Sequence, residues 1–184
     1  MRLLAISGSL RAASYNTALL RAAAELAPEG VTVEFYEGLD RLPHYNEDLD
    51  TDAPPFEVAR LRERIARADA VLIATPEFNG TMPGHLKAAI DWASRPHRSS
   101  ALWGKPVVVI GASVTDYGAI WAQDHVRKAL GLAGARVLDA ELVVPKAREC
   151  FTGECELVDE NVRRALADLL DGLAEHRQSA TRAA

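Results

Sequence analysis

The sequence predicts a doubly wound α/β fold, with a five-stranded parallel sheet and helices on both faces. Two observations carry this prediction: short, continuous aliphatic runs recur five times, and segments with helical spacing alternate with them. Continuous rather than alternating hydrophobicity is typical of strands that are buried on both faces. The alternation requires a parallel sheet, because each right-handed crossover returns the chain to begin the next strand in the same direction.

The predicted strands and helices follow one another in strict order along the chain. Strands are expected at residues 3–6, 31–35, 70–74, 107–110 and 142–144. Each is followed by a predicted helix, because apolar residues recur there at three- and four-residue spacing. Pro83 precedes the third helix, where a first turn has no N–H bond to lose. In chain order the helix markers are Leu19, Ala22, Ala23 and Leu26; Val58, Leu61, Ile65 and Ala68; Leu86, Ile90 and Ala93; Ala122, Val126, Ala129 and Ala133; Val162, Leu166, Leu169 and Leu173.

The length of 184 residues favours one compact domain, which we expect over residues 1–175. Residues 176–184 lack apolar periodicity, so we expect a flexible C-terminal tail there. The connection at residues 38–55 is long and rich in Pro, Asp and Asn. It is either a surface loop that carries function or an irregular crossover.

Composition excludes several classes of function. The chain has 21 Lys and Arg against 26 Asp and Glu, a net charge of −5, which gives no electrostatic footing for nucleic acid or an anionic membrane. The apolar runs are too short for a secretory signal or a membrane span. Cys150 and Cys155 form no disulfide framework or zinc spacing, and the acidic stretch at residues 47–52 lacks the pattern of a calcium loop. We therefore expect a cytoplasmic protein without a bound metal.

The first polar loop follows the first predicted strand and leads into a helix. In doubly wound sheets ligands bind at the carboxyl ends of the strands, and free N–H groups at a helix N-terminus favour an anion. The loop lacks the G-K-[ST] ending of a P-loop and the glycines of a dinucleotide fingerprint, which leaves a monophosphate as the favoured ligand. The alternative is a serine-rich helix cap with a solvated arginine. Its polar side chains are Ser7, Ser9, Arg11, Ser14, Asn16 and Thr17.

The second polar loop follows the third predicted strand. Pro76, Asn79, Gly80 and Gly84 predict a backbone turn whose amides and carbonyls can face a planar heterocycle. Residues 7–16 together with P-E-F-N-G-T-M-P-G-H-L-K-A-A-I-D-W-A-S-R at 76–95 closely resemble the NADPH-dependent FMN reductase family. This is the flavodoxin-like group that includes quinone, chromate and azo-dye reductases. The resemblance is specific at these two motifs and extends more loosely over residues 2–175.

The resemblance implies an FMN site built from three loops. Phe78 stands where the family usually has tyrosine, so stacking or packing by the ring is retained without a phenolic hydroxyl. In the third loop, Tyr117 is either an exposed loop residue or a wall of the substrate pocket. Trp121 stands where relatives often carry a basic residue. By similarity, the cofactor-binding residues would be Ser9, Leu10, Arg11, Ser14, Asn16 and Thr17 around the phosphate, Pro76, Glu77, Phe78, Asn79 and Gly80 along the isoalloxazine, and Ser113 and Gly118 in the third loop.

The resemblance also implies the reaction. NADPH or NADH would pass a hydride to FMN, and a quinone or similar small-molecule acceptor would then take two electrons, with chromate, azo dyes or free flavin as further candidates. No catalytic side chain is expected, because the flavin carries the chemistry. The main alternative is a flavodoxin-like electron carrier, which would be expected to have a stronger acidic face. A phosphate-binding regulatory domain without flavin is a third reading.

Assembly is predicted from the third helix. Met82, His85, Ala89 and Trp92 form a second apolar face on it, and a helix that is apolar on two faces usually meets another surface. We therefore expect a homodimer or homotetramer with the flavin near the seam, as in the family. His85, His97 and His125 form no readable catalytic triad and are expected to be surface or helix-face residues.

Overall fold

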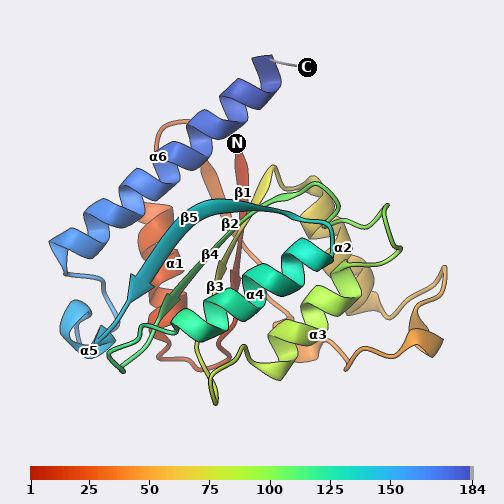
Figure 1. Ribbon diagram of the computed structural model, residues 1–184, viewed down its shortest axis with the longest axis horizontal. Helices are drawn as coiled ribbons and strands as arrows, with labels where there is room; N and C mark the ends of the chain where they lie inside the picture. Colours follow the sequence, from red (N-terminus) through yellow and green to blue (C-terminus); the bar gives the residue numbers. More distant parts are fainter. Residues whose placement is uncertain (183–184) are drawn as a thin grey trace.

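The predicted parallel sheet is present in the computed structural model, which describes the backbone of residues 1–182 and the side chains of residues 1–176. Its five strands pair in the order β2-β1-β3-β4-β5, all in parallel (Figure 1). The chain leaves β1 towards one edge and returns to pair on its other side, so strand order reverses between β1 and β3. The strands are β1 (Arg2–Ser7), β2 (Thr32–Phe35), β3 (Ala70–Ala74), β4 (Pro106–Ala112) and β5 (Arg136–Val144).

Helices cover both faces of the sheet, so the core consists of two layers, one on each side of the sheet (Figure 1). The helices α1 and α6 pack on one face, and α2, α3 and α4 pack on the other. Among the described residues, no helix is long and apolar enough to cross a membrane. The helices are α1 (Tyr15–Glu25), α2 (Phe56–Arg67), α3 (Gly84–Ala93), α4 (Ile120–Leu132), the short α5 (Ala147–Cys150) and α6 (Glu160–Arg182), with single 3-10 turns η1 (Leu39–Arg41) and η2 (Glu47–Leu49).

The structure differs from the predicted elements mainly near the C-terminus. Strand β5 begins at Arg136 rather than at residue 142. Its first half mixes polar and apolar residues because β5 is an edge strand and is not buried along its whole length. Residues 176–182, expected as a tail, continue helix α6, whereas residues 183–184 lie outside the described residues. The division of the chain at residue 175 stays a prediction.

An arginine occupies the irregular part of the sheet. The pairing of β4 with β5 shifts register between Val107 and Val109. The guanidinium of Arg127, on α4, donates to the carbonyl of Val109 at 2.8 Å and to that of Ala140 at 3.2 Å. Carbonyl groups displaced from a ladder need other partners, and Arg127 supplies N–H donors at this shift.

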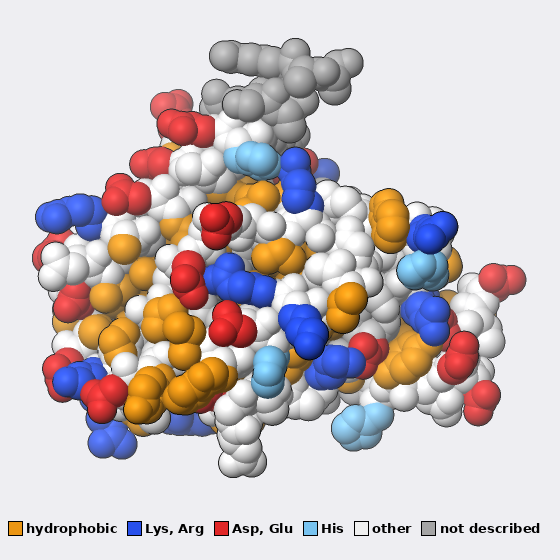
Figure 2. Space-filling model, in the orientation of Figure 1, with side chains coloured by type: hydrophobic (Ala, Val, Ile, Leu, Met, Phe, Trp, Pro, Cys, Tyr) orange, Lys and Arg blue, Asp and Glu red, His pale blue; other side chains and the backbone are white. Residues whose placement is uncertain are grey.

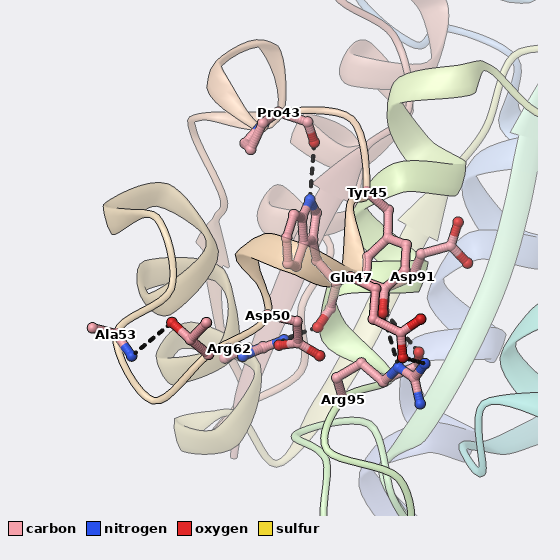
Figure 3. Close-up of polar contacts among 11 residues, drawn as sticks. Pro43, Tyr45, Glu47, Asp50, Ala53, Arg62, Asp91 and Arg95 are labelled. Carbon is pink, nitrogen blue, oxygen red and sulfur yellow. Dashed lines mark hydrogen bonds and ion pairs between the residues drawn. The ribbon is translucent and has the colours of Figure 1, made fainter.

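The long connection at residues 38–55 is a packed crossover held on α3 by Trp92 (Figure 3). The Trp92 side chain is fully buried and donates from Nε1 to the carbonyl of Pro43 at 2.9 Å. The ring of Tyr45 meets it edge-on, with centroids 4.8 Å apart. Arg62 donates to the carbonyl of Trp92 and pairs with Asp50 at 2.7 Å, so this carboxylate of the acidic stretch is held in the crossover by an ion pair.

This packing corrects the sequence argument for assembly. Met82, Ala89 and Trp92 are all buried within the single chain, so they form no apolar face for another subunit. His85 is half-buried and bonds to the carbonyl of Gly8 through Nε2, at 2.9 Å. The buried part of the second face of α3 is therefore covered within the chain, so Met82, Ala89 and Trp92 do not supply a subunit contact.

We expect Trp92→Phe to lower the free energy of unfolding by about 1–2 kcal/mol. The change removes the hydrogen bond to Pro43 and leaves space beside Tyr45. Urea unfolding measures it, with Trp103→Phe as the control: Trp103 is 48% exposed, so its replacement should cost less than about 0.5 kcal/mol. If both variants lose the same free energy of unfolding, the contact of Trp92 with residues 38–55 does not stabilise the fold as proposed.

Candidate functional site

Three loops meet at the carboxyl edge of the sheet, where the strand order reverses. They follow β1, β3 and β4, which are successive neighbours in the sheet, and lie along the lower edge of the view in Figure 1. Crevices form at such reversals because the helices on either side leave towards opposite faces. The fold therefore brings together the three segments that the sequence singled out.

Gly8 joins the first loop to the second. Its N–H donates to the carbonyl of Ala74 at 2.7 Å, and its own carbonyl contacts the imidazole of His85. A Cβ at this position would lie 2.9 Å from Leu86 Cδ2 and 3.2 Å from the Ala74 oxygen. A side chain here would therefore require the buried Leu86 and the end of β3 to shift. The first loop is consequently fixed to the end of β3 and to the first turn of α3.

The first loop ends in a capped helix N-terminus. Ser14 is the N-cap of α1, where its Oγ accepts from the Thr17 N–H at 3.2 Å. The hydroxyl of Thr17 is paired with that of Ser7 at 2.8 Å. Arg11 is exposed and uses one N–H on the carbonyl of Ala13, which leaves guanidinium donors without a partner among the described residues. Hydroxyls, a helix N-terminus and a cation thus converge where a phosphate was expected.

Asn16 and Leu10 occupy different environments in this segment. The buried amide of Asn16 donates to the carbonyl of Ala112 and accepts its N–H, both at 2.9 Å, which ties the start of α1 to the end of β4. One amide hydrogen of Asn16 remains available. Leu10 is 53% exposed at the rim of the loop.

The second loop contains a tight two-residue turn. Phe78 and Thr81 exchange backbone hydrogen bonds of 2.9 and 3.2 Å, and Asn79 and Gly80 have φ angles of +53° and +75°. Two positive φ angles define a type I′ turn, for which Asn-Gly is the favoured sequence. The backbone N–H groups of Asn79 and Gly80 make no hydrogen bond within the described residues. Pro76 lies half-buried before the turn, and Phe78 is 51% exposed on it.

The third loop is supported by the end of β5 and by the residues that follow it. Ser113 donates its N–H to the Val144 carbonyl and shares a 3.0 Å hydroxyl contact with Thr115. Gly118 has a φ of +56°, and a Cβ there would lie 2.4 Å from Val143. It therefore faces the end of β5, whereas Ser113 lies on the more open part of the loop.

An aromatic pair lies beside this loop at the beginning of α4. The rings of Tyr117 and Trp121 have centroids 4.7 Å apart and are 58% and 46% exposed. Hydrophobic side chains gather over this part of the face shown in Figure 2. Tyr117 is thus exposed on the third loop, and its role as a wall of the substrate pocket stays a prediction.

Three side-chain contacts were not foreseen from the sequence. The Glu77 carboxylate accepts from the N–H of Ala122, His125 contacts the hydroxyl of Thr81, and His85 holds Gly8. Each joins segments that lie at least 44 residues apart. No local pattern reports such pairs. Each becomes visible only when the sheet brings two loops together.

The donor set fits FMN. Ser9, Ser14 and Thr17 surround the N-terminus of the eleven-residue helix α1, beside the free guanidinium donors of Arg11, which suits a single dianionic phosphate. The free amides of the type I′ turn suit the carbonyls of a flavin ring. Both groups lie at one edge of the sheet because β1 and β3 are adjacent.

The comparisons with known proteins agree with this reading. A family model described as NADPH-dependent FMN reductase matches residues 1–149. An NAD(P)H-dependent FMN reductase of Pseudomonas aeruginosa is 40% identical over 174 residues, covering 94% of this chain and 93% of the relative. A 2-hydroxy-1,4-benzoquinone reductase of a Burkholderia species is 38% identical over 176 residues, covering 95% and 94%.

A solved structure is similar over nearly the whole length. FerB, a flavoenzyme NAD(P)H:(acceptor) oxidoreductase from Paracoccus denitrificans, superposes with a TM-score of 0.86 at 34% sequence identity, covering 97% of each chain. The flavodoxin-like fold expected from the two motifs is therefore confirmed. The chain belongs to the NADPH-dependent FMN reductase family, whose members are FMN-dependent NAD(P)H oxidoreductases.

Proposed function

We propose that this protein transfers two electrons from NADPH or NADH to a quinone or a similar small planar acceptor, using FMN held at the carboxyl edge of the sheet. The observation that carries the proposal is the pairing of an anion-binding helix N-terminus with a type I′ turn whose amides are free. A quinone is favoured because a relative 38% identical over 95% of this chain is a benzoquinone reductase.

The chain's residues would act by binding and orientation. Ser9, Ser14, Thr17 and the guanidinium of Arg11 would hold the phosphate, together with the remaining amide hydrogen of Asn16. The backbone from Pro76 to Gly80 and the side chain of Ser113 would hold the ring. The chemistry supplied by bound FMN would be uptake of a hydride from the nicotinamide and transfer of two electrons to the acceptor. We assign no general acid or base to the protein.

The proposal includes assembly and location. Phe78, Tyr117 and Trp121 are large apolar side chains exposed around the candidate site, and in a homodimer they would be covered by a second copy of the chain. This aromatic surface replaces the buried face of α3 as the proposed subunit contact. A cytoplasmic location is proposed because that compartment holds the nicotinamide donors.

Arg11→Ala should weaken FMN binding roughly 10- to 150-fold, which corresponds to about 1.5–3 kcal/mol for a hydrogen bond to a charged group. The rate of reduction by NADPH per bound flavin should hardly change, because Arg11 would hold the phosphate and not the ring. A flavin titration followed by stopped-flow reduction at saturating FMN measures both quantities. Intact affinity with slowed hydride transfer would mean that this loop binds the other end of the cofactor.

Asn79→Val should slow reduction by NADPH about tenfold or more in protein saturated with FMN. A β-branched residue at a positive φ costs about 1–2 kcal/mol and would distort the type I′ turn. Asn79→Gly is the matched control, since glycine adopts this φ freely and preserves the turn. Equal rates in the two variants would show that the turn geometry does not matter for reduction.

Trp121→Glu should shift the protein towards single chains in light scattering at micromolar concentration, because a carboxylate would have to be buried in the proposed contact. Leu132→Glu is the control. Leu132 is 78% exposed at the other end of the same helix, away from the aromatic surface. A single-chain mass for the unmodified protein would rule out the homodimer.

A further inference from the structure

Helix α4 begins without a capping side chain of its own. Its N-cap position is Ala119, in the left-handed conformation with a φ of +63°, and its first turn contains no acidic residue. The first N–H groups of a helix have no partner inside the helix and require an acceptor from elsewhere. Among the described residues, Glu77 provides one: its Oε2 accepts from the Ala122 N–H at 3.1 Å.

Glu77 therefore connects the second loop to α4 from 45 positions away. The other end of the same turn is also attached to this helix, because Thr81 Oγ1 lies 2.8 Å from Nδ1 of His125. The type I′ turn is thus held on α4 at both ends. Between them it presents the exposed Phe78 and the free amides of Asn79 and Gly80.

The contact has an electrostatic consequence as well. A helix N-terminus carries the equivalent of about half a positive charge, which a carboxylate in contact with it offsets. Two other carboxylates lie near the start of α4: Asp116 is 3.5 Å from the ammonium of Lys146, and Asp124 is exposed and lies beyond the first turn. The charge of Glu77 thus acts on the helix end beside the turn.

We propose that Glu77 is a positioning residue of the reductase: its carboxylate fixes the ring-binding turn on α4, and its negative charge keeps the reduction potential of the bound flavin low. The inference rests on the proposed function, which places the flavin ring against this turn. A nearby negative charge opposes the arrival of electrons, and it also cancels a helix end that would favour them. Geometry and charge are thus supplied by one side chain.

Two substitutions separate these roles. Glu77→Gln keeps an acceptor oxygen for the Ala122 N–H and removes the charge, whereas Glu77→Ala removes both. In the holoprotein, Glu77→Gln should favour the reduced flavin by up to about tenfold in the two-electron equilibrium, a rise of ~30 mV in midpoint potential. Its affinity for oxidised FMN should match that of the unmodified protein, and the urea midpoint of its apoprotein should fall only slightly, because the hydrogen bond to Ala122 is kept while the charge on the helix end is lost. Glu77→Ala should in addition bind FMN more weakly and lower the apoprotein midpoint further.

Glu25→Gln is the matched control. It removes the same charge from an exposed residue at the far end of α1, so its midpoint potential should not change. The proposal is overturned if Glu77→Gln and Glu25→Gln have the same potential, or if Glu77→Gln loses affinity as Glu77→Ala does. If the unmodified protein binds no FMN or is not reduced by NADPH or NADH, it is the proposed function that fails. In that case the apoprotein midpoints still test the capping contact.

Discussion

The approach of Gly8 to the end of β3 is the contact on which the geometry of the candidate site depends. Strands β1 and β3 are neighbours at the reversal of strand order. A 2.7 Å hydrogen bond from the Gly8 N–H, just after β1, to the carbonyl of Ala74 joins their ends. Any side chain at this position would push Leu86 and the Ala74 carbonyl away. The helix N-terminus of α1 and the turn after β3 consequently share one rigid base, because His85 holds the opposite side of the same peptide.

Most of the chemistry proposed for this edge comes from backbone groups. The N-terminus of α1 and the free amides of the Asn79-Gly80 turn are both consequences of chain conformation. The side chains mainly hold the elements together: Asn16 joins α1 to β4, and Glu77 and His125 join the turn to α4. A fold arranged in this way needs few special residues, since bound FMN would carry the reaction itself.

Local patterns in the sequence were sufficient where burial is uniform. The continuous run at residues 70–74 is buried along its whole length and coincides with β3. The beginning of β5 could not be located in this way, because an edge strand is only partly covered and its polar residues mask the period. The hydroxyl groups of the first loop and the Asn-Gly turn could be recognised from local sequence motifs. The roles of Trp92 and Asp50 were not, because each depends on a partner in another element.

Residues 38–55 bury one face of α3 within the chain, and this decides whether the protein must associate in order to fold. In an obligate dimer the core is completed by the partner, and the unfolding midpoint then rises with protein concentration by mass action. Here Trp92 and its neighbours are buried before any second chain arrives. In the proposed homodimer, dilution should therefore separate the chains without unfolding them.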